Sequence, residues 1–104
     1  MKLITKEIER KLPALGATDG KDPSSVPVVF KLFNPAGAGT WYITEGDLTT
    51  GTLFGLCDLG MGAEIGYVDF NELKGVKLRF GLKIERDLHW EGTLADAMKI
   101  TGYG

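Results

Sequence analysis

The stretch from Thr40 to Leu73 reads TWYITEGDLTTGTLFGLCDLGMGAEIGYVDFNEL and decides the fold. It holds three segments rich in aromatic and branched residues, TWYITE (40–45), TLFGLCDL (52–59) and EIGYVDF (64–70), joined by turns that contain Gly and Asp. Such segments favour β-strands. Short connections join antiparallel neighbours, because a parallel pair needs a crossover of a dozen or more residues. The stretch therefore predicts an antiparallel meander.

The flanking sequence adds strands on both sides of this meander. VVFKLF (28–33) places Val28, Phe30 and Leu32 on one face and Lys31 on the other, which predicts a further strand, followed by a turn at NPAGAG (34–39). KLRFGLKIERDLHWE (77–91) is also predicted to be extended. Residues 16–27, GATDGKDPSSVP, have no apolar period and are predicted to form a mobile loop.

Short helices are predicted near both ends of the chain. Thr5 is placed to cap a helix that ends near Leu12, because Pro13 discourages its continuation. Thr93 is placed to cap a last helix over residues 94–100 in the same way. Residues 101–104 are predicted to form a frayed tail. Asp69 and Glu72 have the spacing of a capping box and predict one helical turn. The fold class is therefore α+β, with an antiparallel sheet of about four or five strands.

Composition limits the classes of protein that the chain can belong to. With 104 residues, of which 43% are hydrophobic and 25% charged, residues 1–104 are expected to form a single globular domain. The N-terminal residues have no apolar core of a signal peptide, and no apolar run approaches the length of about 20 residues that a bilayer requires. Cys57 is the single cysteine, which excludes an internal disulfide. We expect a cytoplasmic protein without a membrane segment.

Charge is distributed unevenly along the sequence. No Lys or Arg lies between Lys31 and Lys74, whereas this window holds six acidic residues, Glu45, Asp47, Asp58, Glu64, Asp69 and Glu72. We expect these acids to give the connecting loops of the sheet a negative potential. A small basic zone follows at residues 74–83, which contain Lys74, Lys77, Arg79 and Lys83.

The sequence holds only weak patterns for a catalytic, metal or nucleotide site. A Cys57–His89 pair would serve nucleophilic catalysis only if the fold brought the two residues together. The acids Asp58, Glu64 and Asp69 lack the regular ligand spacing of a calcium loop. GMGAEIG (60–66) lacks the strand and helix that flank a dinucleotide-binding turn. We therefore expect no catalytic residue, no metal and no cofactor.

A nucleic-acid-binding module is the first alternative to a protein-binding one. It would use Lys74, Lys77, Arg79 and Lys83, if these converge on one face. The net charge of −2 argues against it, so nucleic acid is an unlikely partner and free nucleic acid is expected to bind weakly or not at all near physiological salt. Trp41 and Tyr42 could stack on bases, although adjacent aromatic residues in a strand more often belong to the core.

Three segments in this order, TWYITEGD, LFGLCDLGMGAEIGYVDFNEL and GLKIERDLHWE, resemble the domain-of-unknown-function family 2958. The opening LITKEIERKLPAL matches the start of the same family, and the resemblance covers residues 2–94. The family consists of small bacterial proteins common on plasmids, integrative elements and phages. The resemblance implies a neighbourhood of antirestriction and plasmid-maintenance genes, and it brings no catalytic residues.

The function that we expect is non-enzymatic. We expect an accessory protein of mobile genetic elements that binds a protein, and the resemblance suggests counter-defence, by inhibition of CRISPR or restriction machinery, as its most specific form. The partner would then be a host defence nuclease. Aromatic anchors and acidic loops are the features that a protein interface uses. The predicted partner-binding residues are Tyr42, Asp47, Asp58, Glu64, Tyr67 and Trp90. A small enzyme with an unrecognised site is the further alternative.

Two more predictions concern single side chains. Trp41 and Phe54 are expected in the main core. Arg86 shares the parity of Ile84 and Leu88 in an apolar set, so it is expected to pair with a carboxylate, from Glu45, Asp69 or Glu85.

Overall fold

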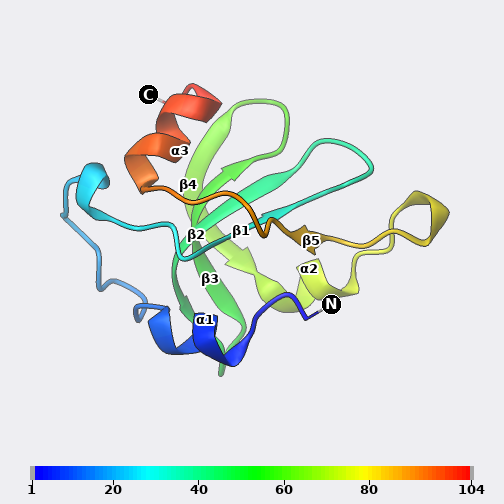
Figure 1. Ribbon diagram of the computed structural model, residues 1–104, viewed down its shortest axis with the longest axis horizontal. Coiled ribbons are helices and arrows are strands. Elements are labelled where there is room, and N and C mark those ends of the chain that lie inside the picture. The colour runs from blue at the N-terminus through cyan, green and yellow to red at the C-terminus, as the bar shows by residue number, and fades with distance from the viewer. Residues whose placement is uncertain (1, 104) are drawn as a thin grey trace.

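A computed structural model describes residues 2–103 and places a curved antiparallel sheet at the centre of the molecule (Figure 1). Three helices and two short 3-10 turns surround this sheet. In chain order the elements are α1 (Lys6–Lys11), a 3-10 turn (Pro23–Ser25), β1 (Phe30–Phe33), β2 (Thr40–Asp47), β3 (Thr52–Asp58), β4 (Ala63–Asp69), α2 (Phe70–Gly75), a 3-10 turn (Arg79–Gly81), β5 (Glu85–Arg86) and α3 (Leu94–Thr101).

The five strands lie in the order β4-β3-β2-β1-β5, and every neighbouring pair is antiparallel. The predicted α+β class and the meander are therefore confirmed. The prediction of a long extended segment over residues 77–91 is wrong, because only Glu85 and Arg86 pair with β1. The segment before them forms a loop. A hydrogen bond from the Leu78 N–H to the Leu82 carbonyl, 2.9 Å long, closes this loop.

One face of the sheet carries the larger core. Buried side chains from the first three strands, including Leu32, Trp41 and Ile43, pack against Phe70 of α2 and Ile84. Trp41 is buried as predicted. Helix α1 also lies against this face through its apolar side. The short helix is therefore held by packing, since six residues alone form no stable helix.

The prediction for Phe54 is wrong. The register between β2 and β3 shifts between Ile43 and Glu45, so Glu45 lies opposite Phe54 and Gly46 lies opposite Leu53. The bulge lies in β2, whereas β3 alternates regularly. Leu53 has the same parity as Gly55 and Cys57, which lie opposite Ile43 and Trp41, so Leu53 faces the main core and is fully buried. Phe54 lies on the other face, half-buried, with its ring edge-to-face against Tyr67 at a centroid distance of 5.0 Å.

The second face holds a smaller cluster around Tyr42, Leu56 and Ala97. Ala97 belongs to α3, which Figure 1 shows beside the upper part of the sheet. Residues 101–104, expected as a frayed tail, begin inside α3. The Tyr103 N–H donates to the Met98 carbonyl at 3.0 Å, and Gly104 lies outside the described residues.

Arg86 has a different partner from the one expected. Its guanidinium donates to the backbone carbonyls of Lys2 and Leu3, at 2.9 and 2.8 Å, instead of pairing with a carboxylate. The prediction of an acidic partner was wrong because the N-terminal segment passes beside β5 and offers two free carbonyl oxygens there. These two hydrogen bonds stabilise the charged guanidinium through the dipoles of the backbone carbonyls.

Candidate binding surfaces

Strand β4 forms an open edge of the sheet, because β3 is its one strand neighbour among residues 2–103. The Phe70 N–H donates to the Gly51 carbonyl at 2.8 Å and extends the β3–β4 ladder. Hydrogen-bonded and non-bonded pairs alternate in antiparallel sheets. The backbone groups of Ala63, Ile65 and Tyr67 therefore point away from β3. Such a row of free N–H and C=O groups can pair with another strand.

Large apolar side chains are exposed beside this edge. Leu59 is 57% exposed, Met61 95% and Tyr67 73%. Glu64 and Asp69 are exposed on the same strand. A shallow groove of about 390 Å³ runs along this side, with Leu59, Glu64, Tyr67 and Asp69 among its lining residues. We call Leu59, Met61, Glu64, Tyr67 and Asp69 the β4 surface. It combines apolar anchors with negative charge.

Three of the predicted partner-binding residues, Asp58, Glu64 and Tyr67, lie on or next to the β4 surface. Asp58 ends β3, and its carboxylate accepts a hydrogen bond from the Gly60 N–H at 2.9 Å, which shapes the turn that presents Met61. These three residues therefore lie along the same edge of the sheet, although Glu64 and Tyr67 differ in parity along β4 and project from opposite faces. Asp47 lies at the other end of the strands, because it pairs with Thr52, at the start of β3.

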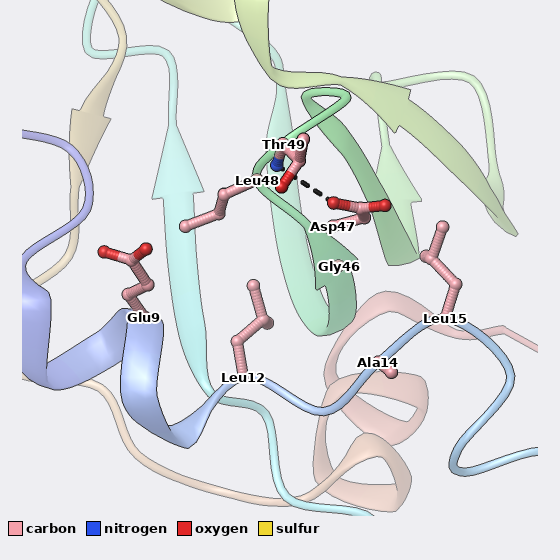
Figure 2. A pocket seen from close by; sticks show the side chains of 8 residues that line it. All are labelled: Glu9, Leu12, Ala14, Leu15, Gly46, Asp47, Leu48 and Thr49. Carbon is pink, nitrogen blue, oxygen red and sulfur yellow. Dashed lines mark hydrogen bonds between the residues drawn. The ribbon is translucent and has the colours of Figure 1, made fainter.

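Asp47 borders a separate pocket between the β2–β3 turn and the segment after α1 (Figure 2). One carboxylate oxygen of Asp47 accepts a hydrogen bond from the Thr49 N–H at 2.9 Å. Leu12 and Leu15 reach the pocket from the N-terminal segment, and Glu9 adds a second carboxylate. Asp47 therefore stabilises the turn, and together with Glu9 it makes the pocket acidic.

The expectation that Tyr42 is exposed was wrong. Tyr42 is buried and packs edge-to-face against Trp90, with ring centroids 5.2 Å apart. The Lys31 ammonium lies 5.2 Å from the Tyr42 ring centre and 5.5 Å from that of Trp90. It also forms an ion pair with Asp87 at 3.4 Å. The half-buried Trp90 and the buried Tyr42 thus join the chain segment after β5 to the sheet.

Electrostatics in this cluster are consistent with a structural role. Burial raises the pKa of the Tyr42 hydroxyl, and the carboxylates of Asp58 and Asp87 raise it further. The pKa of Asp87 is lowered, first by the hydrogen bond from the His89 N–H and then by that from the Trp90 N–H, with Lys31 adding to the effect. The phenol stays neutral and Asp87 stays charged at neutral pH, which maintains the ion pair with Lys31.

Glu45 occupies a position that the sequence did not reveal. It is buried at the bulge of β2, and its carboxylate accepts hydrogen bonds from the Gly16 N–H at 2.6 Å, from the Thr18 N–H at 2.9 Å and from the Thr18 hydroxyl. Burial raises its pKa, but these hydrogen bonds outweigh that effect and the pKa is lowered overall. Glu45 therefore fastens the start of the 16–27 segment to the sheet. The mobility of that segment stays a prediction.

The basic loop (residues 74–83) carries a second feature that sequence reasoning missed. Phe80 at its tip is 92% exposed, and its φ of 59° makes it the one non-glycine residue with positive φ between residues 2 and 103. Such a backbone costs a bulky residue of order 1–3 kcal/mol. Lys74, Lys77, Arg79 and Lys83 are exposed in the same segment. The loop projects from one side of the molecule (Figure 1).

The structure does not bring Cys57 and His89 together. Cys57 lies on β3, whereas His89 follows β5, and strands β2 and β1 lie between them. Three strand spacings correspond to about 14 Å. Burial raises the pKa of the Cys57 thiol to about 11, and the Glu64 carboxylate adds to this. The thiol is therefore protonated at neutral pH, which disfavours it as a nucleophile.

Metal-ligating groups do not converge within the described residues: no group of three or more His, Cys, Asp or Glu side chains is arranged to hold an ion there. None of the helices in this part of the chain has the length and apolar character needed to cross a bilayer.

These features define a small α+β domain whose distinctive surfaces are an acidic open sheet edge and a basic loop. The sequence matches the family described as protein of unknown function (DUF2958) over residues 3–100. The chain therefore belongs to this family, as the resemblance indicated. No curated protein and no solved structure gives a significant match.

Proposed function

We propose that this chain is a non-enzymatic binding protein that recognises another protein through the β4 surface. The observation that supports this most directly is the coincidence of an open strand edge with Leu59, Met61 and Tyr67, which are exposed to 57%, 95% and 73%. Exposed apolar groups beside polar ones are typical of interaction sites. An open edge lets a partner strand add to the sheet through backbone hydrogen bonds.

Charge indicates the kind of partner. Glu64 and Asp69 lie on β4 and Glu72 on α2 after it, while the nearest basic residue along the chain is Lys74. A second copy of the same edge would bring like charges together, which disfavours pairing with itself. A partner with basic residues beside an extended segment would be attracted, and its association rate would fall with added salt.

The wider role follows from the family. We propose an accessory role on mobile genetic elements in the cytoplasm, with counter-defence against CRISPR or restriction machinery as its specific form. The partner would then be a host defence nuclease, whose own nucleic-acid-binding surface is basic and matches an acidic edge. This part of the proposal depends on the gene neighbourhood of the family, not on a motif in the chain.

Affinity capture with paired variants tests the proposal. Immobilised wild-type protein is exposed to bacterial lysate, and captured proteins are identified by mass spectrometry. The double variant Met61→Ala with Tyr67→Ala should lose the captured protein and stay folded with a slightly lower melting temperature, because both side chains are largely exposed and Tyr67 gives up only its edge-to-face contact with Phe54. The matched control is Ile100→Ala, which removes a 61%-exposed apolar side chain on α3 and should keep the partner.

A backbone variant tests the strand-addition mode separately. Tyr67→Pro removes an N–H that points away from β3, so the sheet should persist while strand addition fails. Val68→Pro removes an N–H that points toward β3 and should destabilise the fold. Retention of the partner by both Tyr67→Pro and the Met61, Tyr67 double variant would contradict this site.

A further inference from the structure

We propose that the basic loop binds single-stranded nucleic acid, with Phe80 stacking on a base while the neighbouring cations contact phosphates. This site is separate from the β4 surface, so either proposal can fail without the other. The net charge of −2 argued against nucleic acid at the level of the whole chain. The structure adds a local aromatic group, because it exposes Phe80 at the tip of the loop.

Phe80 is held outward by the loop itself. The Leu78 N–H donates to the Leu82 carbonyl at 2.9 Å and closes the tip, and Phe80 and Gly81 both have positive φ, at 59° and 72°. The ring is 92% exposed and belongs to neither of the two core clusters. An exposed ring with open faces is a stacking platform, and stacking tolerates any base because every base has a π-face.

The cations around Phe80 are available. No acidic residue lies between Glu72 and Glu85, a segment that holds Lys74, Lys77, Arg79 and Lys83. The ion pairs within residues 2–103 are Lys11–Glu7 and Lys31–Asp87, and neither uses the loop. Arg79 donates to the Ala36 carbonyl at 3.5 Å, a long bond that leaves its charge uncompensated.

A groove continues from the loop toward the N-terminal segment. Its volume is about 680 Å³, its apolar residues include Phe70 and Ile84, and Lys2, Lys74 and Lys83 add positive charge. The Lys74 ammonium lies 5.0 Å from the Phe70 ring centre. A nucleic-acid strand can thus stack at Phe80 and extend along this groove. Glu85 at its end limits the site to a few phosphates.

Single strands fit this loop better than a duplex or an acidic protein. A protruding ring stacks on an unpaired base at once, whereas in a duplex it must first separate stacked pairs. An acidic protein would need a preformed pocket to receive the ring. The expected ligand is therefore single-stranded DNA or RNA, bound mainly through phosphates and stacking without sequence preference.

Fluorescence anisotropy of a labelled dT oligonucleotide of about 12 nucleotides measures the binding. With three or four phosphates contacted, the affinity should fall roughly 20- to 50-fold between about 50 and 200 mM salt. Phe80→Ala and Phe80→Gly should each weaken binding by roughly 5- to 100-fold, since both remove the stacking ring. Phe80→Gly also removes the backbone strain, so loss of binding in both variants cannot result from an altered tip.

Charge variants supply a matched control. Lys77→Glu with Lys83→Glu should abolish measurable binding at about 50 mM salt. Lys6→Glu with Lys99→Glu makes the same change in net charge at exposed positions away from the loop and should bind dT nearly as well as wild type. Equal losses in the two double variants would overturn the proposal.

Phe80→Trp provides a direct signature of stacking. The variant should bind dT at least as tightly as wild type, and the emission of the new indole should be quenched by the oligonucleotide. Three results would overturn the proposal: no binding of dT at about 50 mM salt, equal binding of heparin and dT with no effect of Phe80→Ala, or Phe80-dependent binding of a poly-glutamate peptide without binding of dT.

Discussion

Gly55 in β3 lies directly opposite Gly66 in β4, yet the two glycines have different surroundings. A Cβ atom on Gly55 would lie 1.9 Å from the Tyr42 carbonyl oxygen, whereas nothing lies within 4 Å of the equivalent position on Gly66. Only Gly55 is therefore required for the close approach of β2 and β3, next to the bulge that turns Glu45 inward.

Gly55→Ala should lower the free energy of unfolding by about 3 kcal/mol or more, because backbone atoms of β2 cannot move away as a side chain could. Gly66→Ala is the matched control, and it should change stability by less than about 1 kcal/mol, since its site is open. Urea denaturation of both variants measures the difference. Similar losses in the two proteins would show that the close approach at Gly55 has no energetic weight.

Glu45 makes stability depend on pH. Its pKa is lower in the folded protein than in the unfolded chain, so its contribution is present above the unfolded value and disappears as the pH falls through the folded value. Glu45→Gln should cost about 1–3 kcal/mol at neutral pH, because a neutral amide replaces an acceptor of three hydrogen bonds.

The difference in unfolding free energy between wild type and Glu45→Gln should narrow as the pH falls through the lowered pKa of Glu45 in the folded protein. Glu91→Gln, at an exposed position, is the matched control and should leave the stability close to that of wild type. Thermal unfolding between about pH 3 and pH 7 measures both. A difference that stays constant over this range would contradict the role of the ionised carboxylate.

Residue-scale predictions from the sequence succeeded for Trp41 and failed for Phe54. Trp41 is buried as expected, but β3 places Leu53, Gly55 and Cys57 on the same face as Trp41, so Leu53 takes the core position and Phe54 lies on the other face. A single inserted residue exchanges the two faces of a strand, and the sequence contains no signal for the insertion at Thr44. The same bulge explains why the burial of Glu45 was not foreseen.

At the scale of elements, helix starts were predicted well because capping is a local interaction. The side chains of Thr5, Asp69 and Thr93 accept hydrogen bonds from first-turn N–H groups of α1, α2 and α3. Thr93 and Asp96 form a complete capping box, with bonds of 3.2 Å to the Asp96 N–H and 2.8 Å to the Thr93 N–H.

Thr93→Ala should lower the free energy of unfolding by about 1 kcal/mol, because it leaves an N–H at the start of α3 without its partner. Thr93→Ser keeps the hydroxyl and should stay close to wild type. Differential scanning calorimetry compares them. Equal melting temperatures for Thr93→Ala and wild type would mean that packing of Ala97 alone holds α3.

The prediction for segment 77–91 was wrong although its apolar residues do alternate in places. The alternation suggested a strand, but the backbone is not extended throughout. Phe80 and Gly81 have positive φ and reverse the chain, which leaves two residues in β5. Parity alone does not distinguish a strand from a loop with alternating side chains. Gly81 was the available signal, and it marks the tip that presents Phe80.

At the scale of the whole molecule, the separation of acidic and basic residues was predicted from the sequence. The environment of Tyr42 was not. Lys77, Arg79 and Lys83 do lie in one loop directly after α2, and Asp58, Glu64 and Asp69 do lie along the exposed side of the sheet. Tyr42 was assigned to the wrong environment, because the segment that covers it comes from beyond β5. Contacts between distant segments leave no periodic trace in a sequence.

The two proposals can be separated at this scale by charge reversal. Glu64→Lys with Glu72→Lys, both at exposed positions, should impair capture of the protein partner and leave dT binding intact or slightly stronger. Lys77→Glu with Lys83→Glu should have the opposite pattern. Anisotropy and affinity capture on the same two proteins make the comparison, and a single variant that abolished both activities in a folded protein would indicate one shared site.

The order of the strands has a consequence for how the chain reaches its native state. β1, β2 and β3 pair with their immediate successors, whereas β5 joins β1 through Arg86 and Leu32, which lie about half the chain apart. Contacts between near neighbours close small loops and form early, while distant ones carry a larger loop entropy. The β2–β4 hairpins should therefore gain protection from hydrogen exchange first during refolding, and β5 should dock last.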